Sequence, residues 1–136
     1  MRKYKKYDDL AGTEFSCIYK LKSFVNRLLR KYGDPVSSGR NRTVFESKYH
    51  VIKVPRCCDG IVDNDWEGSV SHKYYAKSRL VYISGIPIVF AEKISEISSK
   101  DVLRISEYFD WVRGVDSMQV GYTRKGKLVA FDYGIR

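Results

Sequence analysis

Two β-rich runs, residues 43–45 and 49–54, are separated in the sequence only by Glu46-Ser47-Lys48. A short polar connection between two such runs is typical of an antiparallel hairpin. This feature constrains the fold most, because it requires a sheet in which these two strands are neighbours.

The segment of residues 14–33, EFSCIYKLKSFVNRLLRKYG, has apolar residues at helical spacing with lysines and arginines between them. Thr13 is a suitable N-cap and Gly33 a natural C-cap. We expect an amphipathic helix whose apolar stripe lies in the core. The stripe consists of Phe15, Ile18, Leu21, Val25, Leu28 and Leu29.

A second helix is predicted within residues 59–78. Asp63 or Asn64 would cap it, and acidic residues fill its first turn, where the helix dipole favours them. The residues expected to share one face are Trp66, Val70 and Tyr74.

A third helix is predicted to begin at Ser98 or Ser99 and to end near Gly114. Its expected apolar face is Val102, Leu103, Ile105, Phe109 and Val112. Further strands are predicted at residues 79–84, 87–94, 117–123 and 127–132, with turns at residues 85–87 and 124–126. This order of elements indicates a single α+β domain, residues 1–136, on a mostly antiparallel sheet.

Lysine and arginine number 25 against 16 aspartates and glutamates, a net charge of +9. This charge favours acidic partners such as nucleic acid, nucleotides or an acidic protein face, or it serves solubility alone. Three cysteines without a CxxC spacing indicate reduced thiols and no zinc site. No apolar run approaches the roughly 20 residues of a membrane span, and the basic N-terminus lacks the apolar segment of a secretory signal. A cytoplasmic protein that does not enter a membrane is expected.

Several motifs, taken in order, resemble the nucleotide-binding lobe of protein kinases followed by a remnant of the catalytic lobe. SSGRNRTVF, with Gly39, stands where a kinase has its glycine-rich loop. VIKV resembles the third-strand motif V-A-I-K and makes Lys53 the candidate for the α- and β-phosphates. Glu67, 14 residues later, stands where a kinase places the glutamate that pairs with this lysine.

The resemblance continues towards the end of the chain. VFAEKI, with Glu92, resembles the hinge that contacts the adenine ring, and FDYG resembles the D-F-G motif, with Asp132 as the metal-holding aspartate. Gln119, 13 residues before Asp132, takes the place of the second magnesium ligand. The resemblance thus implies ATP and magnesium as cofactors, if the site is retained. The implied nucleotide-binding residues are Gly39, Lys53, Glu67, Glu92, Gln119 and Asp132.

Departures from the family pattern argue against catalysis. By spacing, H-R-D has become Val112-Arg113-Gly114, so the catalytic carboxylate is missing. The phosphate loop has one glycine, beside Arg40 and Arg42, which would crowd the site or hold phosphates themselves. The sequence ends two residues after Gly134, before the segments that bind the acceptor in a kinase. We therefore expect a pseudokinase-like protein that transfers no phosphate.

Each motif residue also has an interpretation outside the resemblance. Lys53 could face solvent from a strand, and Glu67 could be a first-turn acid favoured by the helix dipole. Asp132 could belong to an ordinary turn, Gln119 could be a solvated strand residue, and Arg113 could be a cation at the end of a helix.

A kinase-like protein without catalysis is expected to act by binding. The main hypothesis is a protein that modulates or inhibits a macromolecular partner, for example a phage product that binds a host protein. The expected partner contacts are Arg27, Arg30, Lys31, Arg40 and Arg42. The alternatives are a vestigial phosphotransferase active only as an oligomer, and a basic nucleic-acid-binding module that also uses tyrosines such as Tyr74 and Tyr75.

Overall fold

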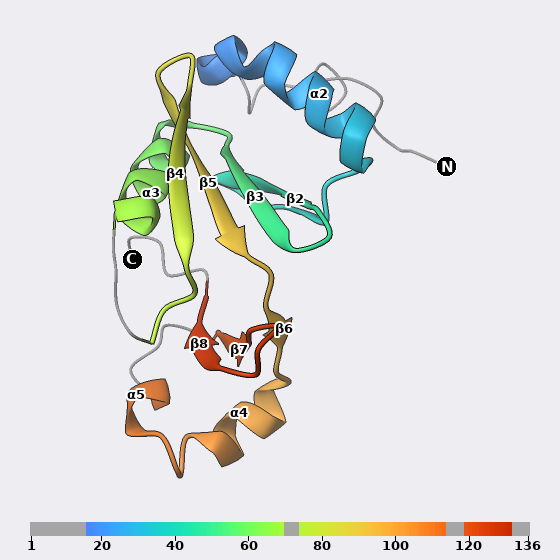
Figure 1. Cartoon of the computed structure of the whole chain (residues 1–136). Helices are drawn as coiled ribbons and strands as arrows, with labels where there is room; N and C mark the ends of the chain where they lie inside the picture. Colours follow the sequence, from blue (N-terminus) through green and yellow to red (C-terminus); the bar gives the residue numbers. More distant parts are fainter. Residues whose placement is uncertain (1–15, 70–73, 114–118, 132–136) are drawn as a thin grey trace.

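The computed structural model describes residues 16–69, 74–113 and 119–131. These residues form a five-stranded sheet with helices packed on it and, below it in Figure 1, a three-stranded sheet with two short helices. Neighbouring strands of the larger sheet all pair antiparallel. The chain is therefore an α+β protein with a mostly antiparallel sheet and an N-terminal helix, as the sequence predicts.

The larger sheet has the strand order β1-β2-β3-β5-β4. The hairpin predicted from the two β-rich runs is confirmed as β2 and β3, with Val44 opposite Lys53. The strands are β1 (Ser37–Ser38), β2 (Arg42–Glu46), β3 (His50–Pro55), β4 (Ser78–Ile83) and β5 (Ile86–Glu92).

Helix α2 (Lys22–Tyr32) follows a 3₁₀ turn, η1 (Ser16–Leu21), and covers one face of this sheet (Figure 1). The predicted stripe is buried where its side chains are described, and Thr13 and Phe15 lie outside the described residues. Gly33 is the C-cap, as predicted, with a φ of 80° and its N–H bonded to the Leu29 carbonyl. The resulting core joins Leu21, Phe24, Val25, Leu28 and Leu29 to Phe45, Ile52, Val54, Ile86 and Ile88.

Helix α3 (Cys58–Ser69) begins only two residues after β3 and packs against β3, β4 and β5. The expected caps are wrong, because Asp63 and Asn64 lie inside the helix and are buried. Trp66 is 47% exposed, and Tyr74 lies beyond the helix, so the expected apolar face is also wrong. Val70 lies outside the described residues. The face that α3 buries is polar instead, consisting of Gly60, Asp63, Asn64 and Glu67.

The smaller sheet has the order β6-β7-β8 and rests on a second core of Val102, Val112, Val120 and Ala130. The third predicted helix is divided, although Ser98 caps its start as expected by accepting a hydrogen bond from the Asp101 N–H. Leu103 and Phe109, expected in the core, are 58% and 47% exposed. The elements are β6 (Ser95–Glu96), α4 (Ser99–Ile105), α5 (Asp110–Arg113), β7 (Val120–Tyr122) and β8 (Leu128–Ala130).

The division has a local cause, because the backbone at the end of α4 finds partners that do not continue the helix. The Ser106 hydroxyl donates to the Leu103 carbonyl at 2.7 Å, and the Tyr108 N–H bonds to the Ile105 carbonyl at 2.9 Å. The tighter turn lets α5 begin in a new direction, so that Val112 is fully buried.

Two hairpin turns connect strands of the same sheet. The β4–β5 turn lies at Ser84 and Gly85, both with positive φ, so the predicted turn at residues 85–87 is displaced by about one residue and Pro87 belongs to β5. The β7–β8 turn at residues 124–126 is as predicted, with a positive φ at Gly126.

Gly60 provides a test of how closely α3 packs under the loop before β2. A Cβ atom at this position would lie 2.1 Å from the Asn41 carbonyl oxygen, which is a backbone atom. We expect Gly60→Ala to lower the free energy of unfolding by about 1–3 kcal/mol through overpacking, although alanine is the better helix former. Urea denaturation measures this, with Ser69→Ala, an exposed substitution in the same helix, as the control. Equal stability of the two variants would contradict the close packing.

Candidate functional site

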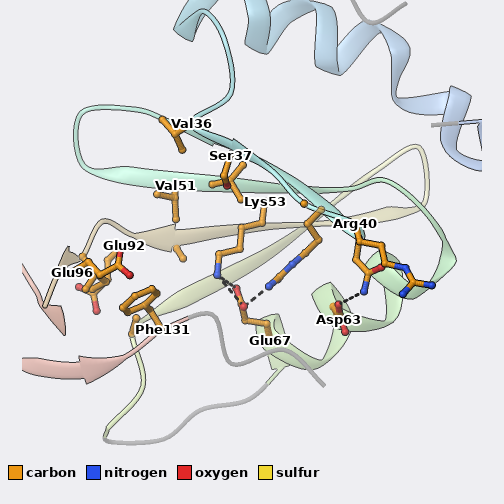
Figure 2. A pocket seen from close by; sticks show the side chains of 17 residues that line it. Val36, Ser37, Arg40, Val51, Lys53, Asp63, Glu67, Glu92, Glu96 and Phe131 are labelled. Atoms are coloured by element: carbon orange, nitrogen blue, oxygen red, sulfur yellow. Dashed lines mark hydrogen bonds and ion pairs between the residues drawn. The ribbon is translucent and has the colours of Figure 1, made fainter. Parts of the chain in front are cut away.

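A pocket of about 570 Å³ opens on the face of the larger sheet opposite α2 (Figure 2). Strands β1 to β3 form its roof, α3 closes one end, and the segment after β5 together with Phe131 forms the other. The volume lies in the range of small-molecule sites.

Charged side chains line the α3 end of the pocket. The Lys53 ammonium lies 3.0 Å from Oε1 and 2.8 Å from Oε2 of Glu67. It donates a hydrogen bond to Oε1, whereas its contact with Oε2 does not have the geometry of a hydrogen bond. The Arg42 guanidinium donates to the same Oε1 at 3.1 Å. Glu67 is fully buried, and the Lys53 and Arg42 side chains are each 9% exposed. One carboxylate thus pairs with two cations that come from neighbouring strands.

Local sequence explains why these groups meet. Lys53 and Val51 are two residues apart on β3, so both point to the pocket face. Val44, opposite Lys53 in the register, brings β2 alongside, and Arg42 follows the same alternation. The short connection from β3 to α3 then brings Glu67, more than two turns into the helix, below the strand.

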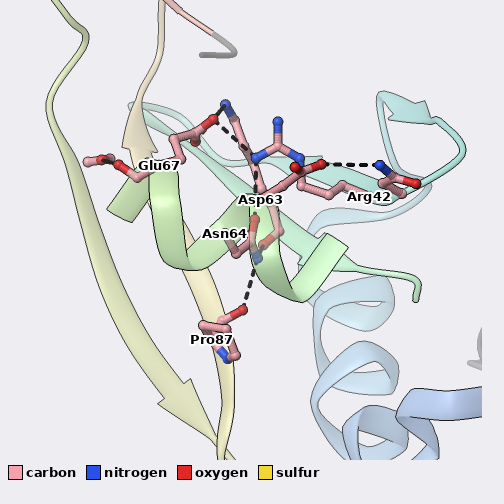
Figure 3. Close-up of polar contacts among 8 residues, drawn as sticks. Arg42, Asp63, Asn64, Glu67 and Pro87 are labelled. Atoms are coloured by element: carbon pink, nitrogen blue, oxygen red, sulfur yellow. Dashed lines mark hydrogen bonds and ion pairs between the residues drawn. The ribbon is translucent and has the colours of Figure 1, made fainter. Parts of the chain in front are cut away.

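Asn64 fixes α3 in this position (Figure 3). Its amide nitrogen donates to the carbonyl oxygens of Lys53 and Pro87, each at 2.9 Å, and so ties the helix to β3 and β5. Its side-chain oxygen accepts a bond from Arg42 at 3.3 Å. Asp63 accepts a bond from the Asn41 side chain at 3.2 Å, which holds the loop before β2.

The loop at residues 39–41 is also held from the β3 side. The Arg56 guanidinium donates to the Gly39 carbonyl at 2.8 Å and to the Ser38 hydroxyl. The backbone N–H of Arg56 donates to the Asn41 carbonyl at 2.7 Å. A Cβ at Gly39 would meet only the Arg42 carbonyl oxygen, at an ordinary 3.8 Å. The single glycine of this loop is therefore not required by the backbone, unlike a glycine that must allow phosphates to approach closely.

The opposite end of the pocket is apolar, with two carboxylates at its edge, Glu92 and Glu96 (Figure 2). The backbone N–H groups of Glu92 and Lys93 are bonded to the carbonyls of Lys77 and Tyr49, both at 3.0 Å. They are not available to a bound base, so a ring at this end would be held by apolar contact. The apolar residues that line the pocket are Val36, Val44, Val51, Ala76, Ala91, Ile94 and Phe131.

Four of the predicted nucleotide-binding residues, Gly39, Lys53, Glu67 and Glu92, line this one pocket. The predicted approach of Lys53 and Glu67 is confirmed by their ion pair. Gln119 does not line it, but its carbonyl accepts the Phe131 N–H at 3.0 Å, beside the strand end that leads to Asp132. Asp132 itself lies outside the described residues. Over the described ranges, no group of three or more histidines, cysteines, aspartates and glutamates could hold a metal ion.

The residues predicted to bind a partner differ in their exposure. Arg27, Arg30 and Lys31 are exposed on α2, and Arg40 is exposed on the loop. Arg42 begins β2, and its side chain is 9% exposed and pairs with Glu67 in the pocket, so it does not lie on an exposed loop as expected. The reason is the alternation of β2, which directs this side chain towards α3.

Sequence reasoning missed the polar residues that support the ion pair. Asn64, Asp63 and Arg56 each hold a neighbouring backbone or side-chain group, yet none belongs to a motif. The available signal was the set of polar residues at positions 63, 64 and 67, which has helical spacing and follows a strand containing a lysine.

Comparison of the chain with protein-family models, curated proteins and solved structures gave no match. Among the described residues, no helix has the length and apolar character needed to cross a membrane.

Lys53, Arg42 and Glu67 form an ion cluster in which Glu67 is shared. Substitutions in this cluster should therefore lower the free energy of unfolding by unequal amounts. Glu67→Gln removes the carboxylate that Lys53 and Arg42 share and should lower the free energy of unfolding by about 3–5 kcal/mol. Lys53→Met leaves Glu67 paired with Arg42 and should cost less. Chemical denaturation measures both, with Asp101→Asn in the exposed Asp101–Arg104 pair as a control expected to stay within about 1 kcal/mol. A Glu67→Gln variant as stable as that control would contradict the cluster's structural role.

Proposed function

We propose that the chain is a kinase-like domain that binds a nucleotide without transferring its phosphate, and that it acts by binding a macromolecular partner. The observation that carries the proposal is the buried Lys53–Glu67 pair at the charged end of a pocket whose other end is apolar. A nucleotide has the same division, with an anionic phosphate chain at one end and a flat base at the other.

The order of the elements supports the kinase-like identity. A loop joins the first two strands, the lysine is on the third strand, the glutamate is on the helix that follows, and Glu92 ends the next pair of strands. These are the positions that the motifs imply from the sequence.

The charges support binding of phosphate in particular. Arg42 and Lys53 bring two cations together at the α3 end of the pocket, and Arg40 is exposed at the same end. Guanidinium and ammonium groups in a partly dry site form charge-assisted hydrogen bonds to phosphate oxygens. Phosphates at Arg42 and Lys53 would direct the base towards Val51, Ala91 and Phe131.

Titration of the protein with ATP, with and without magnesium, tests this binding. Lys53→Met removes a charge-assisted donor worth about 1.5–3 kcal/mol, so the affinity should fall about tenfold or more. Lys100→Met, which removes an exposed lysine on α4, should leave the affinity unchanged. Failure of millimolar ATP to bind, or equal binding by the two variants, would overturn the proposal.

The absence of phosphate transfer is a separate expectation. Gly114 stands where the family has its catalytic aspartate, and loss of such a group typically lowers the rate by about 10²–10⁴. Incubation with radiolabelled ATP and generic protein acceptors should therefore give no labelled product above background. Robust transfer that Asp132→Ala abolishes would instead identify an active phosphotransferase.

A further inference from the structure

A second hollow, about 450 Å³ in volume, lies where the start of β3 and the end of β5 meet the β7–β8 turn. We call it the basic groove. Its lining contains five cations, Lys77, Lys93, Arg124, Lys125 and Lys127, with the single carboxylate Glu92. All five are exposed.

Over residues 16–69, 74–113 and 119–131, most of this charge has no carboxylate partner. Lys93 pairs with Glu46. Lys77, Arg124, Lys125 and Lys127 have no carboxylate partner within the described part of the chain, and the Glu92 carboxylate accepts the Lys77 backbone N–H at 2.8 Å. Like charges gathered in one hollow repel each other, so an anion that bridges them would be bound favourably.

The groove has a defined shape, because an aromatic contact joins its two sides. The Arg124 guanidinium carbon lies 4.5 Å from the centre of the Tyr49 ring, and the Lys48 ammonium lies 5.2 Å from the same ring. Tyr49 belongs to the β2–β3 turn and Arg124 to the β7–β8 turn, so this contact connects the larger sheet to the smaller one.

An aromatic hollow of about 520 Å³ adjoins the basic groove and shares Lys127 with it. The rings of Tyr74 and Trp111 are stacked there, with centres 4.5 Å apart and planes within 4°. Phe109 and Tyr122, which are 47% and 41% exposed, complete its aromatic lining. The β7–β8 turn thus separates a row of cations from a set of flat rings.

We propose that these two hollows together bind single-stranded nucleic acid, with phosphates in the basic groove and a base in the aromatic hollow. Positive grooves that follow the backbone, next to aromatic rings that stack on bases, are how proteins hold single strands with little sequence preference. A duplex does not fit this arrangement, because its bases are already stacked within it. This surface shares Glu92 with the pocket that contains Lys53 and Glu67, but its cations are other residues than the arginines predicted from the sequence.

Fluorescence anisotropy with a labelled oligothymidylate of about 12 nucleotides tests the proposal across a series of salt concentrations. The double variant Lys77→Gln, Lys125→Gln should reduce the slope of log affinity against log salt by about 1.4, or about 0.7 per phosphate contact. The control is Arg27→Gln, Lys31→Gln, which removes the same charge from exposed positions on α2 and should leave the slope unchanged.

Two further variants separate stacking from charge. Tyr122→Ala should weaken binding about fivefold or more without changing the salt slope, since stacking is not electrostatic. Lys53→Met should leave the oligonucleotide affinity unchanged, so that failure of the nucleotide pocket does not affect this result.

Three results would overturn the proposal. The first is no binding of the oligothymidylate at low salt, and the second is an equal loss of slope in the two double variants. The third is competition by poly-glutamate as effective as that by unlabelled oligothymidylate, which would assign the surface to an acidic protein. Tighter binding of the single strand than of a duplex of the same length supports the proposal.

Discussion

The buried carboxylate of Glu67 is the interaction on which the rest of the structure depends. It lies between an ammonium from β3 and a guanidinium from β2, so one helix side chain connects two neighbouring strands. Moving such groups out of water costs several kcal/mol per ion, and the attraction between them repays this only with good geometry and further hydrogen bonds. Asn64 supplies these bonds by holding Arg42, the Lys53 carbonyl and the Pro87 carbonyl. The arrangement fixes α3, and α3 in turn closes the pocket.

The two faces of the larger sheet are therefore stabilised by different forces. Against α2, aliphatic and aromatic side chains are packed without charge, and that helix has the apolar stripe expected of it. Against α3, the helix buries a polar face whose groups are paired with the strands. A charged interface is directional, whereas an apolar one is not. The directional side is the one that borders the pocket, where side-chain positions matter for a ligand.

Sequence reasoning succeeded where the buried face was apolar or where a short turn defined the geometry. The β2–β3 hairpin and the α2 stripe are examples, and so is the Ser98 cap of α4. The Lys53–Glu67 contact was predicted from the resemblance to kinases rather than from periodicity. The buried face of α3 was predicted wrongly. Apolar spacing selects Trp66, which is half exposed, whereas the residues that are buried there are polar. The prediction failed again at α4, where a serine that bonds to its own turn divides a regular pattern.

The net charge of +9 also has a different meaning once the fold is known. Three of the cations are largely buried, and their charge is not presented to a partner. Two of them, Lys53 and Arg42, pair with Glu67, and the third, Arg56, holds the loop at residues 39–41. Among the described residues, exposed cations lie on α2 and in the basic groove, with others such as Arg79, Lys100 and Arg104 elsewhere on the surface. In the groove, cations from segments that flank both sheets converge onto one hollow that adjoins exposed aromatic rings. Composition alone cannot separate these groups, because the distinction depends on which way each strand directs its side chains.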